Sequence, residues 1–381
     1  MSKEKKPLQW QAIVTMIAFM LVGAVCGFII VGFMDEILTD DTPLKTELLL
    51  FFGMLVGIYL SIFLSFIIHE AGHLVFGLMT GYKFCSYRIG SLLLIKQNGK
   101  LRIKKYSIAG TGGQCLMVPP DMVYGSFPVT AYNLGGVLMN LLIFVICLTA
   151  YFVIDSKTLF TGLLLVNAVV NLAIALTNGI PMKGAVNNDG HNAFSLESNK
   201  AAMRAFWLEL KINEAMSNGV NLKDMDESWF VMPKDEELSN SIVGDIAVFC
   251  CNRYLAEHRF DEAKEAITHL ISTQNSIVPI NKHLLTADKI YIMLISGEPK
   301  EQIDLLLTKE QKKMMKLLSS MPSILRTEYA YALLAEKNGK KAAKIKKQLN
   351  NMAKSYPYAG EIASEQELID IADKASDKSL E

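Results

Sequence analysis

The sequence predicts an α-helical integral membrane protein: four transmembrane helices with a small membrane-associated β-hairpin, followed by an all-α cytoplasmic domain. Composition and charge distribution support this fold class. The chain of 381 residues is 51% hydrophobic, and its formal net charge is zero. Residues 1–194 carry 10 acidic and 13 basic residues, whereas 195–381 carry 28 acidic and 25 basic residues. These features exclude a disordered chain and a basic nucleic-acid-binding protein, so we expect no nucleic acid partner.

Four apolar stretches in the first half are each long enough to span a membrane. A helix of about 20 residues crosses a hydrocarbon core of roughly 30 Å. The expected transmembrane helices cover residues 8–34, 48–78, 126–154 and 158–182. The first stretch is longer than the apolar region of a signal peptide and shows no small-residue cleavage site, so we interpret it as a retained helix. We therefore expect a lipid bilayer around residues 1–195.

The distribution of lysine and arginine predicts the orientation of these helices, because cytoplasmic loops are enriched in basic residues. Three lysines precede the first helix, and residues 81–121 carry seven basic residues against one acid. The loop 35–47, in contrast, is acidic. The sequence therefore predicts a multi-pass protein of the cell membrane whose N-terminus and C-terminal domain are both cytoplasmic.

Residues 91–106 contain two β-prone runs on either side of Asn98-Gly99. This dipeptide readily supplies the two positive φ angles of a type I′ hairpin turn. We therefore expect a β-hairpin in this segment, within a small sheet that lies at the cytoplasmic face of the membrane.

The second apolar stretch contains an H-E-x-x-H motif, formed by His69, Glu70 and His73. Residues four apart lie on one face of a helix, so both imidazoles can reach the same metal ion. Glu70 is adjacent and can accept a proton from a metal-bound water. Ionisable residues within a membrane helix are costly unless they serve a function. The alternative is a pair of interfacial histidines beside an acid that reaches toward the headgroups.

A catalytic zinc site usually takes three protein ligands and leaves one position open for water. Asp189 is the candidate for the third ligand, because it is the only acid between Asp155 and Glu197. The second and fourth helices are both expected to run toward the cytoplasm, which brings Asp189 to the side where the histidines lie. The alternative is a turn residue, since aspartate before glycine is common in turns. Asn188 or His191 could also assist the metal site.

Together these motifs resemble those of the site-2 protease family of intramembrane zinc metalloproteases, in a divergent bacterial form. The similarity covers about residues 45–195 and comprises H-E-x-x-H in one helix, then N-x-x-P (Asn178 to Pro181) and Asp-Gly at the end of a later one. The spacing from Pro181 to Asp189 is wider than in the common form of the family. The resemblance implies a Zn²⁺ cofactor, with Glu70 as the general base. The implied metal ligands are His69, His73 and Asp189.

An intervening helix carries another element of the family's pattern, with Gly136 and Asn140 in place but Val137 where proline is usual. In the family this asparagine faces the catalytic centre. Asn140 is therefore a candidate to stabilise the oxyanion, and Asn178 is a second candidate. The alternative for either side chain is a hydrogen bond between helices.

The resemblance implies hydrolysis of peptide bonds in membrane-spanning or signal-like peptides. A substrate helix must unwind before attack, and a strand edge can hold the unwound segment by β-addition. We assign this edge to the hairpin, at Leu101 and Ile103. The alternative function is that of a catalytically weak membrane protein that binds peptides as an accessory to immunity or export, although the retained Glu70 argues against it. A soluble zincin is inconsistent with four apolar stretches.

The second half of the chain shows apolar residues at helical spacing and a normal content of charge. We expect a linker over 196–239 and a cytoplasmic α-helical domain over 240–374. Short links about 40 residues apart make this domain similar to tetratricopeptide hairpins, and a generic helical domain is the alternative. Because stacked helical hairpins often bind peptides, a protein partner is expected here.

Overall fold

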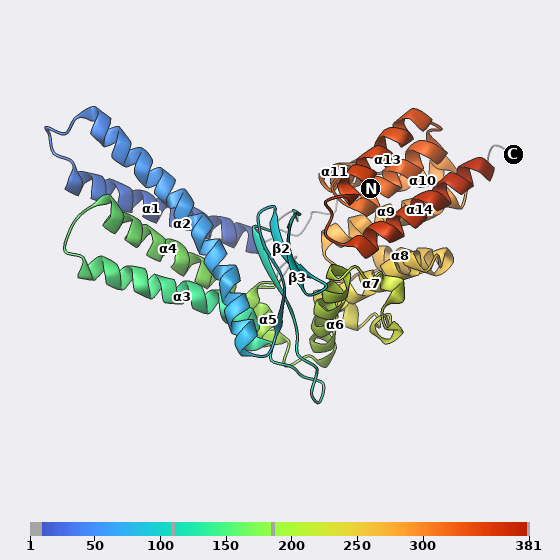
Figure 1. Cartoon of the computed structure of the whole chain (residues 1–381), viewed down its shortest axis with the longest axis horizontal. Coiled ribbons are helices and arrows are strands. Elements are labelled where there is room, and N and C mark those ends of the chain that lie inside the picture. The colour runs from blue at the N-terminus through green and yellow to red at the C-terminus, as the bar shows by residue number, and fades with distance from the viewer. Residues whose placement is uncertain (1–9, 108–110, 184–186, 379–381) are drawn as a thin grey trace. The chain divides into compact units, whose positions relative to one another are not determined.

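The computed structural model of the chain describes residues 10–107, 111–183 and 187–378. It is mostly helical, with four long apolar helices, a four-stranded antiparallel sheet and a helical C-terminal region (Figure 1), which confirms the expected fold class. Two compact units can be distinguished. The first, called the bundle unit, comprises Met1–Tyr82, Gly112–Cys115 and Pro128–Ser198. The second, called the sheet unit, comprises Lys83–Thr111, Leu116–Phe127 and Asn199–Glu381.

Four long helices pack side by side in the described part of the bundle unit (Figure 1). They are α1 Trp10–Ile37, α2 Leu44–Met79, α3 Thr130–Val153 and α4 Leu159–Gly179. The prediction of four helices is confirmed, and the observed helix ends differ from the predicted ends by up to four residues. The third helix begins at Thr130, and Val123 and Ser126 form a β-bridge before it. The N-terminal lysines and the predicted first two residues of the first helix lie outside the described residues.

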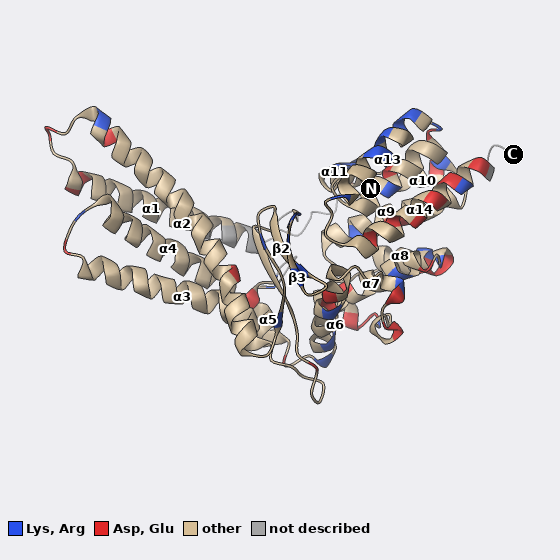
Figure 2. Cartoon of the chain, in the orientation of Figure 1, with Lys and Arg blue, Asp and Glu red and all other residues tan. Residues whose placement is uncertain are grey.

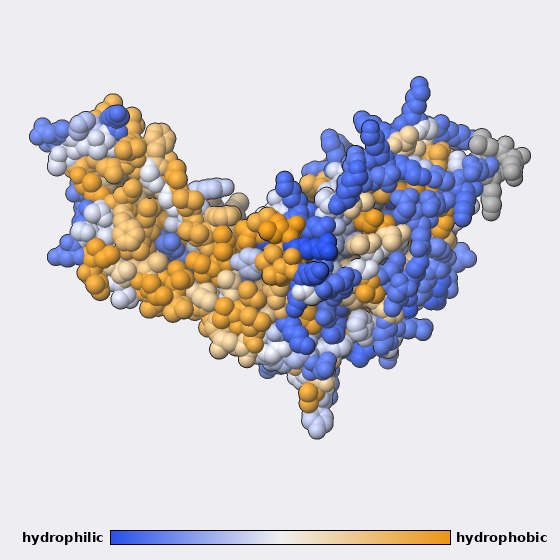
Figure 3. All heavy atoms as spheres, viewed as in Figure 1, coloured by the Kyte–Doolittle hydropathy of each residue, from blue (hydrophilic) through white to orange (hydrophobic). Residues whose placement is uncertain are grey.

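The surface of the bundle unit is that of a membrane protein. Charged residues are rare along the four helices (Figure 2), and hydrophobic residues cover the face seen in Figure 3. Within the described residues, all four helices are long and apolar enough to cross a bilayer. Large apolar side chains such as Phe28 and Leu49 are 78% and 71% exposed. These are the features of a multi-pass membrane protein.

One face of α2 is directed into the bundle, although the helix is apolar all round. Its buried residues include Met54, Gly57, Ser61, Ser65 and His69, which recur every three or four positions. Residues at this spacing share one helix face, and α2 packs against α3 and α4. Ser61, Ser65 and His69 are therefore enclosed by helices rather than by lipid.

The antiparallel sheet has the strand order β3-β2-β1-β4, so β3 and β4 are its edge strands. Its strands are β1 Lys83–Ile89, β2 Leu92–Gln97, β3 Lys100–Lys105 and β4 Gly113–Val118. Asn98 and Gly99 have φ angles of 49° and 79° between β2 and β3. The predicted hairpin is thereby confirmed. Leu101 and Ile103 lie on β3, and their side chains are exposed.

The hairpin shares a core with the C-terminal helices in the sheet unit. Leu93 and Ile95 are buried on one face of β2 and pack with Tyr356 and Tyr358. The hairpin therefore belongs to the same compact unit as the C-terminal region. The sequence placed the hairpin in a domain over 1–195, and these contacts join it to residues more than 250 positions away.

The C-terminal region is all-α, and its successive helices pack as hairpins, for example α7 with α8 and α12 with α13. Its helices are α6 Lys200–Ser217, α7 Ser241–Ala256, α8 Phe260–Ser272, α9 Pro279–Ile295, α10 Lys300–Leu306, α11 Lys309–Leu317, α12 Pro322–Ala330, α13 Gly339–Ala353 and α14 Ala359–Lys378. The expected linker 196–239 is only partly irregular. It contains the regular helix α6, whose buried apolar side chains give it one packed face.

Candidate metal centre

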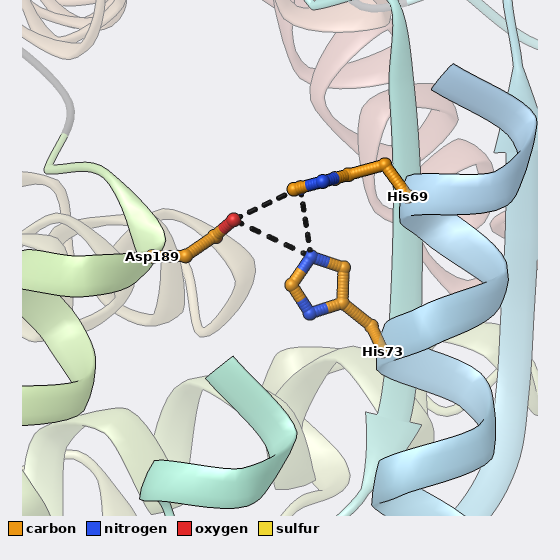
Figure 4. Close-up of side chains that lie close together, drawn as sticks. All are labelled: His69, His73 and Asp189. Carbon is orange, nitrogen blue, oxygen red and sulfur yellow. Dashed lines mark hydrogen bonds and ion pairs between the residues drawn. The ribbon is translucent and has the colours of Figure 1, made fainter. Parts of the chain in front are cut away.

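The candidate metal centre lies in the bundle unit, between α2 and α5 (Asp189–Ser195). His69 and His73 are buried on the inward face of α2. Their Nε2 atoms lie 3.2 Å apart, and Asp189 Oδ2 lies 2.9 Å from Nε2 of His69 and 3.5 Å from Nε2 of His73 (Figure 4). Among the described residues, these three form the one group of histidine, cysteine or acidic side chains close enough together to hold a metal ion.

Hydrogen bonds at the far side of both rings determine how the imidazoles can bind. His73 Nδ1 lies 2.8 Å from the backbone oxygen of Tyr132. A carbonyl oxygen only accepts hydrogen bonds, so Nδ1 donates, and the neutral ring has its lone pair at Nε2. His69 Nδ1 similarly donates to Asn140 Oδ1 at 2.7 Å. Two lone pairs and a carboxylate oxygen therefore converge, and a cation between them would stabilise this arrangement.

Asn188 holds the third member of the centre in place, because it caps α5 one residue before Asp189. Its Oδ1 accepts hydrogen bonds from the backbone N–H groups of Met182 and His191, both at 3.0 Å. Its Nδ2 donates to two backbone oxygens at the end of α4, at 2.9 and 2.7 Å. These bonds use the whole side chain, so Asn188 assists the centre as a clamp rather than as a ligand. The side chain of His191 is not part of the convergent group.

Asp189 brings a negative charge to the centre. Burial alone would raise the pKa of Asp189, but the neighbouring imidazoles of His69 and His73 outweigh burial and hold this pKa well below its usual range. The carboxylate is therefore charged at neutral pH. Metal binding requires a carboxylate ligand in this deprotonated form.

Glycines allow α2 and α3 to approach closely enough to build the centre. A Cβ atom at Gly72 would lie 2.8 Å from the Cα atom of Gly136, and one at Gly136 would lie 2.7 Å from Nδ1 and Nε2 of His69. A side chain at either position would have to move a helix or the imidazole ring. The small residues at these positions are therefore part of what positions the histidines.

Glu70 packs against the first residue of β4. A Cβ atom at Gly113 would lie 2.7 Å from both Cγ and Oε1 of Glu70. The hydroxyl group of Tyr132 donates to the backbone oxygen of Cys115 at 2.8 Å. Because the backbone oxygen of Tyr132 also holds His73, the start of β4 is attached to the same turn of α3 that supports the centre.

Asn140 is placed beside the centre, but its amide is oriented differently from an oxyanion donor. The side chain is fully buried. Its Nδ2 group donates to Ser65 O at 3.2 Å and to Asn171 Oδ1 at 2.7 Å. Both N–H bonds are therefore used away from the three convergent ligand atoms. This geometry favours a role in holding His69 over the oxyanion role expected from the sequence.

The other candidate substrate-binding residues have different surroundings. Asn178 lies at the end of α4 and is half-buried, with Nδ2 donating to Ile174 O at 2.9 Å, one turn back. Its role in stabilising an oxyanion stays a prediction. Leu101 and Ile103 belong to the sheet unit, on an edge strand, and their contact with substrate also stays a prediction.

Several groups that hold the centre were not identified from the sequence. Ser65 could have been identified from its spacing, because it lies four residues before His69 and four after Ser61, on one helix face. Asn171 could have been identified in a similar way, because it lies seven residues before Asn178, on the same helix face. The role of the Tyr132 backbone oxygen could not have been identified from the sequence, because every residue carries a carbonyl group.

Fold and centre together define a multi-pass membrane protein with a buried group of two histidines and one carboxylate. Comparison of the chain with models of protein families, with curated proteins and with solved structures finds no match.

Proposed function

We propose that the chain is an intramembrane zinc metalloprotease of the site-2 protease type, which hydrolyses membrane-spanning or signal-like peptides with a zinc-activated water. The convergence of His69, His73 and Asp189 carries this proposal. Two ligand atoms about 2.0–2.1 Å from a tetrahedral zinc lie about 3.3 Å from each other. The three distances between the ligand atoms, 2.9, 3.2 and 3.5 Å, bracket this value.

The surrounding residues supply the remaining chemistry. Zinc, when bound, lowers the pKa of a water molecule and polarises a peptide carbonyl. Glu70 is the residue next to His69, and its carboxylate takes the proton of the attacking water and delivers it to the leaving amine. Asn178, at the end of α4, is our candidate for the donor that stabilises the oxyanion.

The depth of the centre supports a substrate within the membrane. His69 lies ten residues before the end of α2, and Asn140 lies ten residues after the start of α3. At 1.5 Å per residue, both are about 15 Å from the same end of the bundle. We propose that this end faces the cytoplasm, because the seven basic residues of 81–121 follow α2 directly. The C-terminal helices then lie in the cytoplasm, where we propose that they bind a protein partner.

The decisive test asks whether cleavage depends on bound metal. Protein purified in detergent should contain zinc, and cleavage of candidate transmembrane peptides should stop after chelation and return when zinc is added. Bound zinc without cleavage of any candidate peptide would favour the peptide-binding role in immunity or export. A chain that takes up no zinc at neutral pH would contradict the proposal.

Two strand edges are candidates to hold the unwound substrate. The sequence favoured β3, at Leu101 and Ile103, and the structure adds β4 at the opposite edge of the sheet. We propose that β4 is the one used, because its first residue, Gly113, packs against Glu70. A peptide added to β4 would have its backbone next to the general base.

Proline substitutions distinguish the two edges, because proline removes one backbone N–H donor. We expect Gln114→Pro in β4 to lower kcat/KM by about 10-fold or more, since each lost hydrogen bond costs about 0.5–1.5 kcal/mol and the strand is also distorted. Gln114→Ala, which keeps the N–H group, should cleave normally. The double variant Leu101→Pro, Ile103→Pro should retain cleavage and zinc. The reverse pattern, with cleavage lost only in the β3 variant, would assign the substrate to β3.

A further inference from the structure

A connected set of buried polar side chains leads from the centre into the apolar bundle. Asn140 on α3, Asn171 on α4 and Ser65 on α2 are all fully buried. Asn171 Nδ2 donates to Ser65 Oγ at 2.9 Å, and Ser65 Oγ donates to Ser61 O at 2.7 Å. Polar side chains at this depth are expensive unless all of their hydrogen bonds are made. Three helices contribute to this set, so it depends on the assembled bundle.

Backbone carbonyl groups fix the direction of every hydrogen bond in the set. Ser65 O and Asn167 O can only accept, so Nδ2 of Asn140 must face the first at 3.2 Å and Nδ2 of Asn171 the second at 2.9 Å. The amide oxygens then face the opposite way. Asn171 Oδ1 accepts from Asn140 Nδ2 at 2.7 Å, and Asn140 Oδ1 accepts from His69 Nδ1. If the side-chain amide of either asparagine were rotated by 180°, two donors or two acceptors would face each other.

We propose that Asn171 and Asn140 are positioning residues that fix the tautomer of His69, so that its Nε2 lone pair always faces the metal. The proposal rests on the proposed function in that it takes the centre to bind zinc. Without an acceptor at Nδ1, a neutral imidazole can carry its proton at Nε2, where Asp189 Oδ2 at 2.9 Å would accept it, and this form cannot bind metal. Partners that orient ligating histidines typically change metal affinity about 10–100-fold.

A purely structural role for Asn140 and Asn171 would lead to a different result. If these side chains only join helices, their replacement lowers the stability of the bundle and leaves the tautomer of His69 unchanged. Asn133 offers a matched control on α3. It is also buried, but its Nδ2 group donates to Val129 O at 2.8 Å, before the start of the helix. Asn133→Leu therefore removes a buried amide of the same helix without removing the acceptor of His69.

The first measurement is zinc affinity in detergent, by competition with a chelator of known affinity. We expect Asn140→Leu to bind zinc about 10–100-fold more weakly, and Asn171→Leu to lose affinity in the same direction by a smaller factor. Asn140→Asp keeps an oxygen acceptor opposite Nδ1 and should restore affinity to near the wild-type value. Asn133→Leu should bind zinc as the wild type does.

The second measurement observes the tautomer directly, in metal-free protein with ¹⁵N-labelled histidine and an Asp189→Ala background, so that no carboxylate accepts a proton from His69 Nε2. It is tractable because the chain has six histidines. Asn140→Leu should move one histidine from the Nδ1–H form to a mixture of forms, and Asn140→Asp should not. If Asn140→Leu fails to fold, the same comparison is made with Asn171→Leu. Unchanged zinc affinity and unchanged tautomer would overturn the proposal. A wild-type protein that binds no zinc would contradict the proposed function instead, and the tautomer spectrum would still decide this inference.

Discussion

Glu70→Gln should lower kcat for a transmembrane peptide by about 10²–10⁴-fold and leave zinc content unchanged. Glutamine has nearly the same size as glutamate and fits the same space against Gly113. It cannot accept the proton of the attacking water, so the general base is lost while His69, His73 and Asp189 remain. The measurement pairs metal analysis of the purified protein with steady-state cleavage in detergent.

The matched control for this variant is Glu47→Gln, in the first turn of the same helix. It makes the same chemical change far from the centre and should cleave at the wild-type rate. Full activity in Glu70→Gln would remove Glu70 from the mechanism, and with it the argument that the centre contains a general base. A loss of zinc together with activity would show that Glu70 supports the metal site rather than the proton transfer.

The candidate ligands could be predicted because each depends on local geometry or on a simple count of helices. His69 and His73 share a face by their spacing alone. Asp189 joins them because the second and fourth of four crossing helices run in the same direction. The Asn98-Gly99 turn was predictable for a similar reason, since two adjacent residues determine its backbone angles.

Other parts depend on contacts that no local pattern specifies. A helix that is apolar on all faces does not reveal how it is rotated in the bundle, so the bonds of Ser65 and Asn171 could not be assigned beforehand. Pairing of β4 with a distant strand is likewise non-local. The packing of Ile95 against Tyr356 places the hairpin with the C-terminal helices, and neither residue alone predicts it.

Asp189→Ala should weaken zinc binding by more than about 100-fold, because loss of a ligand must exceed the 10–100-fold cost of losing a partner that only orients one. Alanine removes both the third ligand atom and the charge that draws a cation between the two imidazoles. Asp155→Ala, in the loop between α3 and α4, is the matched control and should retain the wild-type affinity.

Asn188→Ala refines this test, because it leaves the carboxylate in the chain but releases the clamp on α5. We expect an intermediate loss of zinc affinity, about 10-fold, with the same one-zinc stoichiometry. Affinity would be measured by chelator competition for all three variants under the same conditions. Full zinc affinity in Asp189→Ala would place the third ligand elsewhere, and a double variant with His191→Ala would then show whether that histidine replaces it. A zinc affinity that falls step by step from Asp155→Ala through Asn188→Ala to Asp189→Ala would instead show that the position of one carboxylate determines whether this bundle binds its metal.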